Sequence, residues 1–369
     1  MLALCLALLA DPVTVERSVF GKADDGQTVE AFTLRNDAGF SAKLITLGAT
    51  IQSLNVPTAA GPTTDVVLGF DDVAGYQSDR NPYFGCVVGR YANRIIGATF
   101  DLDGQTHNVT ANIRGKHHIH GAGELSQAVW EAETIEGTNS AGVEFRYASP
   151  AGAEGFPAAV DFSVRYLLAE DANSLMVVHR AVPDAPTVLN LTNHSYFNLN
   201  GHDGGPITNH TLQIDSERFT EVDGERMPTG AFVDVDGTPY DFREPRRIGD
   251  VIETAKDGDY VGYDQNYVIG QYQPNRFVAV VAEASSPTTG LIMRVGTDEP
   301  AVQLYTPNMR SLPGKGGIEY VGRSSLCLET QHYPASPNHA HFPSTVYTPE
   351  SPLTSRTIFA FETAEPDAK

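Results

Sequence analysis

The sequence has little positive charge, few cysteines and no long apolar run. Its 369 residues contain 25 Lys and Arg against 46 Asp and Glu, which gives a formal net charge of −21. Because no basic stripe is present to neutralise phosphates, this composition argues against nucleic acid as a partner. It argues more weakly against anionic membrane surfaces. A neutral small molecule is the partner that fits best.

The small number of cysteines and the absence of common nucleotide-binding and catalytic motifs exclude further classes of protein. Cys5, Cys86 and Cys327 are too few and too scattered for a disulfide framework or a zinc ribbon. The chain has no Gly-rich dinucleotide fingerprint, Walker loop, HExxH helix or GxSxG elbow. The glycine-rich stretch at 314–317 lacks the strand–loop–helix setting that cradles phosphate, and we interpret it as a mobile loop.

The one strongly apolar segment stands at the beginning. Residues 1–10, MLALCLALLA, are shorter than the ~20 residues that span a bilayer. They resemble the apolar region of a secretory signal peptide, although a basic segment before it is missing. We expect a signal-peptide remnant at 1–10 and a periplasmic or extracellular protein. The alternative is a strand or irregular start in a cytoplasmic protein.

Apolar and polar residues alternate along much of the remaining chain, which is typical of half-buried strands. Asp103-Gly104 predicts a type I′ hairpin turn between residues 100 and 109. The only helix candidates are short, such as 125–133. Further strands are expected at 143–147, 160–166, 277–284 and 291–295.

These patterns predict an all-β fold, a large antiparallel β-sandwich with few short helices. No Gly/Ser-rich linker, repeat or low-complexity tract interrupts residues 11–369, so we expect them to form a single domain.

Glu329 and His194 stand in stretches that are dense in polar side chains, and neither is specific for one function when taken singly. Glu329 follows the apolar residues 326–328, where burial would raise its pKa and its strength as a base. His194 is the side chain type most readily protonated near neutral pH, and Asn190 and Asn193 are expected to orient its ring. Taken singly, Glu329 also fits a buried ion pair and His194 a core histidine bonded to the backbone.

Other polar stretches have equally plain alternatives. His117, His118 and His120 lie close together, but no acidic or cysteine ligand is nearby, so a metal site is the weaker interpretation. Arg90 and Arg94 fit either a binding site or simple pairing with surplus acids.

In chain order the sequence carries a series of specific motifs. The series is GRYANRI (89–95), HHIHG (117–121), NLTNHSYFNLNG (190–201), MPTG (227–230), GTPYDF (237–242), GYDQNYV (262–268), EPAVQLYT (299–306) and CLETQHYPASPNH (327–339). The longest are NLTNHSYFNLNG and CLETQHYPASPNH. Together they resemble the aldose 1-epimerase (galactose mutarotase) family from about residue 15 to 365.

The resemblance implies a galactose mutarotase-like supersandwich that interconverts the α and β anomers of free aldohexoses such as galactose and glucose. It implies no cofactor and no metal. It makes Glu329 the catalytic base and His194 the catalytic acid. The residues implied to bind the sugar are His120, Asn93, Arg94, Asp264 and Gln303.

The sequence departs from the family pattern at three places. Ala122 stands where a second glycine is usual, Gln265 where a histidine is usual, and residues 323–326 read RSSL instead of HSGF. The last change lies beside the base, so it bears on sugar preference and rate. We also expect one tyrosine among Tyr91, Tyr267 and Tyr305 to present its ring to the sugar.

Three other functions stay open at this stage. A hexose-6-phosphate 1-epimerase would need extra basic residues for the phosphate, and the net charge opposes it. A non-catalytic sugar-binding protein would not need both Glu329 and His194. A glycoside hydrolase usually needs two carboxylates around the bond, and only one is strongly placed. We expect no nucleic-acid or membrane partner, and a monomer or dimer.

Overall fold

The computed structural model describes residues 13–364 except 60, 138, 258–259 and 309. The expected signal remnant at 1–10 therefore lies outside the described residues. None of the described helices is long and apolar enough to cross a membrane.

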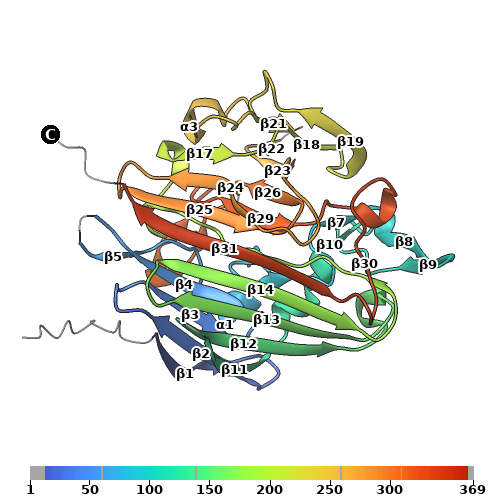
Figure 1. The fold of residues 1–369 in the computed structure, drawn as a ribbon, viewed down its shortest axis with the longest axis horizontal. Helices are drawn as coiled ribbons and strands as arrows, with labels where there is room; N and C mark the ends of the chain where they lie inside the picture. Colours follow the sequence, from blue (N-terminus) through green and yellow to red (C-terminus); the bar gives the residue numbers. More distant parts are fainter. Residues whose placement is uncertain (1–12, 60, 138, 258–259, 309, 365–369) are drawn as a thin grey trace, which may run out of the picture.

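The described chain is built almost entirely of β-strands, as predicted, and three sheets carry most of them (Figure 1). The helices are single short turns, namely α1 (Val73–Gln77), α2 (Glu124–Gln127) and α3 (Ile248–Val251). The N-terminal sheet has the order β1 (Thr14–Lys22), β2 (Thr28–Arg35), β3 (Ser41–Ile45), β4 (Thr50–Pro57) and β5 (Thr63–Asp65).

The largest sheet has nine strands, and Figure 1 shows its long strands running side by side. Their order is β11 (Glu131–Gly137), β12 (Ser140–Ser149), β13 (Val160–Ala169), β14 (Ser174–Pro183), β31 (Leu353–Thr363), β25 (Leu291–Thr297), β24 (Val278–Ser285), β17 (Thr211–Ile214) and β20 (Arg246–Arg247).

A third sheet of five strands holds the residues that the site needs. Its order is β19 (Pro228–Asp234), β18 (Arg218–Val222), β23 (Asp264–Val268), β26 (Ala301–Tyr305) and β29 (Cys327–Gln331). Short pairs complete the fold: β6 (Val87–Val88) with β16 (Thr192–Asn193), β7 (Arg94–Ile95) with β10 (His118–Ile119), β8 (Thr99–Leu102) with β9 (Gln105–Asn108), β15 (Thr187–Val188) with β30 (Val346–Tyr347), β21 (Lys256–Asp257) with β22 (Tyr260–Val261), and β27 (Leu312–Pro313) with β28 (Glu319–Tyr320).

The core lies between the sheets and follows from the alternation in the sequence. Along β13 and β31 every second residue is buried. Phe32 of β2 meets Phe145 of β12 edge to face, with ring centroids 6.1 Å apart. Phe359 of β31 packs on Phe197 at 5.0 Å. These contacts bury apolar area between elements that are far apart in the chain, which is the main favourable term in folding.

The hairpin prediction at Asp103-Gly104 is confirmed. Both residues have positive φ, 51° and 76°, as a type I′ turn requires, and β8 pairs with β9 around them. The strands expected at 143–147 and 160–166 lie within β12 and β13. Those expected at 277–284 and 291–295 correspond to β24 and β25, which pair as a hairpin.

Two local predictions were wrong. The helix expected at 125–133 ends at Gln127, because the Trp130 ring is buried in the core with its Nε1 donating to the Leu125 carbonyl, and β11 starts at Glu131. The glycine-rich stretch at 314–317 is an anchored turn. Its Lys315 ammonium is buried and donates to the Gln52 and Val67 carbonyls and, at 2.6 Å, to the Asp65 carboxylate.

This anchor gives a stability prediction. Lys315→Met removes the cation but leaves the Asp65 carboxylate, only 17% exposed, without its partner. Breaking a buried pair from one side costs about 3–5 kcal/mol. We expect urea unfolding to show a loss of that order. The exposed Lys22→Met serves as control, and equal stability of the two variants would contradict the anchoring role.

Candidate active site

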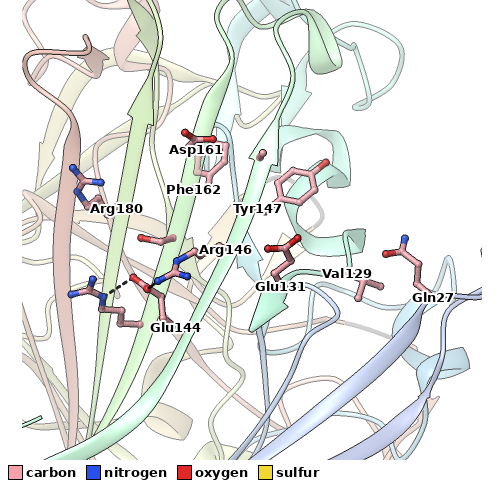
Figure 2. Close-up of a pocket in the computed structure, with 12 residues that line it drawn as sticks. Gln27, Val129, Glu131, Glu144, Arg146, Tyr147, Asp161, Phe162 and Arg180 are labelled. Carbon is pink, nitrogen blue, oxygen red and sulfur yellow. Dashed lines mark hydrogen bonds and ion pairs between the residues drawn. The ribbon is translucent and has the colours of Figure 1, made fainter. Parts of the chain in front are cut away.

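A concavity of about 730 Å³ lies over strands β11 to β14 of the nine-stranded sheet (Figure 2). Glu144 at its base is ion-paired with Arg165 at 2.7 Å and also with Arg146. The acidic and basic side chains of this groove thus neutralise each other, and its described lining includes no histidine. This groove offers no acid–base pair, so we place the chemistry elsewhere.

A smaller cleft of about 260 Å³ brings together every residue that the sequence predicted for the site. Glu329, Gln303 and Asp264 come from strands β29, β26 and β23. His194 directly follows β16, and Arg94 opens β7. The full lining is Pro82, Tyr83, Asn93, Arg94, Ile119, His120, His194, Tyr196, Arg226, Asp264, Gln303, Tyr305 and Glu329.

Strand geometry explains why these side chains meet. Side chains alternate along a strand, so Glu329 shares one face of β29 with Cys327, while Leu328 points to the other face. Gln303 is the cross-strand partner of Glu329, and Asp264 is the partner of Tyr305 on the same β26 strand. The three strands therefore present one polar row toward the cleft.

His120 reaches the cleft through a tight turn beside β7. Its backbone N–H donates to the Asn93 carbonyl, and its Nδ1 accepts from the Asn93 N–H, both at 3.1 Å. An accepting Nδ1 carries no proton, so the neutral ring has its proton on Nε2. A Cβ on Gly121 would lie 1.7 Å from the Gly89 carbonyl oxygen, and φ there is +62°. Only glycine allows this close approach.

His194 and Glu329 face each other at the buried end of the cleft. Nε2 of His194 lies 3.5 Å from Oε2 of Glu329, and both side chains are at most 6% exposed. The other imidazole nitrogen, Nδ1, lies 3.7 Å from the Cys327 sulfur. The rings of Tyr196 and Tyr83 lie nearly parallel to the His194 ring, at 5.1 and 6.0 Å.

Burial shifts both members of this pair toward their neutral forms. Desolvation raises the pKa of Glu329 well above its usual range, and Asp264 raises it further, whereas Arg94 lowers it. Desolvation lowers the pKa of His194 to about 4. The sequence led us to expect a histidine that is readily protonated near neutral pH, whereas burial here opposes the protonated imidazole as well as the ionised carboxylate.

The expectation that Asn190 and Asn193 orient His194 is also wrong. Asn190 Nδ2 donates to the carbonyls of Ala92 and His332, and Asn193 Nδ2 donates to the Gly85 carbonyl. Both amides fix the backbone around the site. The His194 ring is held instead by its aromatic neighbours and Cys327.

A hydrogen-bonded network lines the opposite end of the cleft. Asp264 accepts from Gln303 at 2.7 Å and from Arg94 at 3.1 Å, and Gln303 in turn accepts from Asn93 at 3.2 Å. Arg90, by contrast, is fully buried, and its guanidinium donates to Ser149 and nearby backbone carbonyls. Of the two arginines in the motif, Arg94 belongs to the cleft and Arg90 to the scaffold.

Among the described residues, only His194, Cys327 and Glu329 form a cluster of three potential metal ligands, with their atoms within 4.8 Å of one another. The three histidines at 117–120 do not gather in this way. His117 Nδ1 accepts from the Gly97 N–H and His118 Nδ1 contacts the Thr110 carbonyl.

Sequence reasoning missed several cleft residues. Tyr83, Tyr196 and Arg226 line it, together with Tyr305, which was one of three tyrosines considered. Tyr91 and Tyr267 are buried elsewhere in the core. Tyr196 lies two residues after His194 in the quoted motif, so the sequence could have indicated that it lies near the cleft. Arg226 lies on a hairpin tip 38 residues before Asp264 (264 − 226), and no spacing rule links them.

Known proteins share both the sequence and the fold. Residues 30–360 match the family profile described as aldose 1-epimerase. The chain is 38% identical over 356 residues to galactose mutarotase from Bos taurus, which covers 95% of this chain and all of the relative. The chain belongs to the aldose 1-epimerase family.

Further members of the aldose 1-epimerase family agree with this assignment. Aldose 1-epimerase from Escherichia coli is 34% identical, covering 87% of this chain and 91% of the relative. An aldose epimerase homologue from C. elegans superimposes with a TM-score of 0.80 at 31% identity, over 89% of this chain and 98% of that one. Galactose 1-epimerase from Lactobacillus acidophilus gives 0.81 at 25% identity, over 96% and 100%. The predicted mutarotase-like sandwich is confirmed.

The raised pKa of Glu329 has a measurable consequence for stability. In the unfolded chain a glutamate titrates near its ordinary value of about 4.3, whereas the folded protein holds this proton more tightly. Stability therefore falls as the pH rises from the unfolded pKa through the folded one. Glu329→Gln cannot ionise, so at pH 8 we expect it to be more stable than the unmodified protein.

The gain is about 1.4 kcal/mol for each pKa unit between the two states, and it shrinks toward pH 4. Urea unfolding at pH 5 and pH 8 measures it, with the exposed Glu16→Gln as control. Equal stability of Glu329→Gln and the unmodified protein at pH 8 would show that burial does not oppose ionisation here.

Proposed function

We propose that this chain interconverts the α and β anomers of free aldohexoses, with Glu329 as base and His194 as acid. The observation that carries the proposal is the 3.5 Å separation of their reacting atoms in a buried cleft. A pyranose opens when O1 loses a proton while the ring oxygen O5 gains one, and these oxygens share the anomeric carbon. Two groups this close reach both oxygens of one sugar.

The proton inventory of the pair fits this reaction. The ring-opening step starts when the single proton of the pair moves from the carboxyl to the imidazole. The ionised Glu329 then takes the proton of O1, the protonated His194 gives its proton to O5, and the C1–O5 bond breaks to leave an aldehyde. The pair ends as a protonated carboxyl and a neutral imidazole, the forms that burial favours for both groups. Rotation about C1–C2 and reversal of both transfers close the ring as the other anomer.

The remaining cleft residues supply the contacts that a neutral polyol needs. The Asp264 carboxylate accepts hydrogen bonds, the Arg94 guanidinium donates them, and the amides of Asn93 and Gln303 do both. His120 donates through Nε2, and burial together with the nearby His194 and Arg94 lowers its pKa well below the usual range. It therefore acts as a neutral donor to a sugar hydroxyl.

The geometry weighs against hydrolysis. The second carboxylate of the cleft, Asp264, is already bonded to Arg94 and Gln303. Glu329 instead faces an imidazole at 3.5 Å. Hydrolysis by two carboxylates needs one acid and one base or nucleophile on either side of the glycosidic bond.

Substitution of either member of the pair tests the assignment. We expect Glu329→Gln and His194→Asn each to lower kcat for anomerisation of α-galactose and α-glucose by at least about 10²-fold, the usual contribution of an acid or a base. Polarimetry measures the rate after subtraction of the buffer-catalysed background. Near-normal rates in either variant would rule out its role, and competition with glucose 6-phosphate tests a phosphosugar preference.

The pH profile tests the shared proton. The active pair holds one proton, so kcat/KM should be bell-shaped. Activity falls on the acid side near pH 4, where His194 (pKa about 4) binds a second proton and no base is left. It falls on the alkaline side when the proton held by buried Glu329 is lost and no acid remains. Polarimetric rates from pH 4 to 9 that keep rising would contradict this scheme.

A further inference from the structure

The tip of the hairpin between β18 and β19 is a rigid turn that carries Arg226 into the cleft. The Asp223 carboxylate accepts from the N–H groups of Glu225 and Met227, at 2.8 and 2.9 Å. The Asp223 carbonyl accepts from the Arg226 N–H at 2.8 Å. Arg226 adopts a left-handed backbone conformation with φ of 64°, which this turn enforces.

The same tip is tied to the opposite wall of the cleft. The Glu225 carboxylate pairs with the Lys116 ammonium and lies 3.5 Å from Nε2 of His117. His117 precedes the cleft residue His120 by three positions. The tip therefore spans from the HHIHG segment to the strands that hold Asp264.

The Arg226 guanidinium contacts an aromatic ring and a carboxylate at the cleft. Its Cζ lies 4.2 Å from the centroid of the Tyr260 ring, a cation–π distance. Its Nη1 lies 3.8 Å from Oδ2 of Asp264, the oxygen that also accepts from Arg94. The side chain is 31% exposed and is among those that line the cleft.

The position of Asp264 indicates which part of a bound sugar would lie next to Asp264 and Arg226. Glu329 lies on β29 and Asp264 on β23, with β26 between them. Neighbouring strands are about 4.8 Å apart, so two strand spacings separate the anomeric chemistry from this corner. In a pyranose the C3–C4 edge lies opposite the C1–O5 bond, so a ring with O1 and O5 at Glu329 and His194 that lies across β26 would present this edge to Asp264 and Arg226.

We propose that Arg226 is a substrate-contacting residue that donates hydrogen bonds to the hydroxyls on the C3–C4 edge of the aldose and so sets the preference among sugars. The inference rests on the proposed function. Arg226 is suited to the task because its planar fork presents several donors in a fixed geometry. Galactose and glucose differ in the configuration of the C4 hydroxyl, so a residue that binds this hydroxyl distinguishes the two sugars.

The test is the kinetics of Arg226→Leu and Arg226→Lys on galactose, glucose and deoxygenated galactoses. Loss of a charged donor should raise KM for galactose by about 10-fold while kcat stays within about 3-fold. 2-Deoxygalactose keeps both edge hydroxyls and should show the same rise. With 3-deoxy- or 4-deoxygalactose, at least one substrate should show a rise of less than about 3-fold, and lysine should restore part of the galactose affinity.

A matched control lies on the same hairpin. Arg218 also stacks on an aromatic ring, with Cζ 4.4 Å from the Phe232 centroid, but it is not among the residues that line the cleft. Arg218→Leu should therefore leave KM unchanged, and thermal unfolding checks that both leucine variants fold.

Three results would overturn the inference: a galactose KM unaltered by Arg226→Leu, an equal rise for all the deoxygenated sugars, or an equal effect of Arg218→Leu. Failure of the proposed function would look different. The unmodified protein would then show no anomerisation above background.

Discussion

The site depends on one contact, an imidazole and a carboxylate held 3.5 Å apart where water is largely excluded. Desolvation opposes charge on both groups and so favours a protonated carboxyl and a neutral imidazole. That preference makes Glu329 a stronger base than an exposed glutamate and His194 a stronger acid than an exposed imidazolium. In the proposed reaction, proton transfer through a sugar would therefore move the pair toward the forms that burial favours.

The scaffold keeps Glu329 buried although ionisation there is unfavourable. Antiparallel pairing of β23, β26 and β29 fixes the strand that carries this side chain. Buried amides and cations such as Asn190, Arg90 and Lys315 tie the connecting segments to backbone carbonyls. Buried polar residues thus either line the cleft or anchor the backbone around it, and the role of each depends on its surroundings.

The sequence predicted the fold class well, because period-two alternation and turn dipeptides are local signals. The hairpin at Asp103-Gly104 and the strands β12 and β13 follow from them. The helix expected at 125–133 failed because burial of Trp130 and pairing of β11 with β12 override local propensity. The glycine-rich stretch at 314–317 looked mobile because its anchor, Asp65, lies 250 residues away in the chain.

For the site, the sequence by itself determined which residue types are present and, through its motifs, which ones gather in the cleft, His194 and Glu329 among them. The tertiary structure alone decided the direction in which their pKa values shift, because a pKa depends on burial and on neighbours contributed by other strands. It also decided the separate roles of Arg90 and Arg94, four residues apart, and it brought Arg226 into the cleft. Such contacts arise from the path of the chain in space, and no local pattern encodes them.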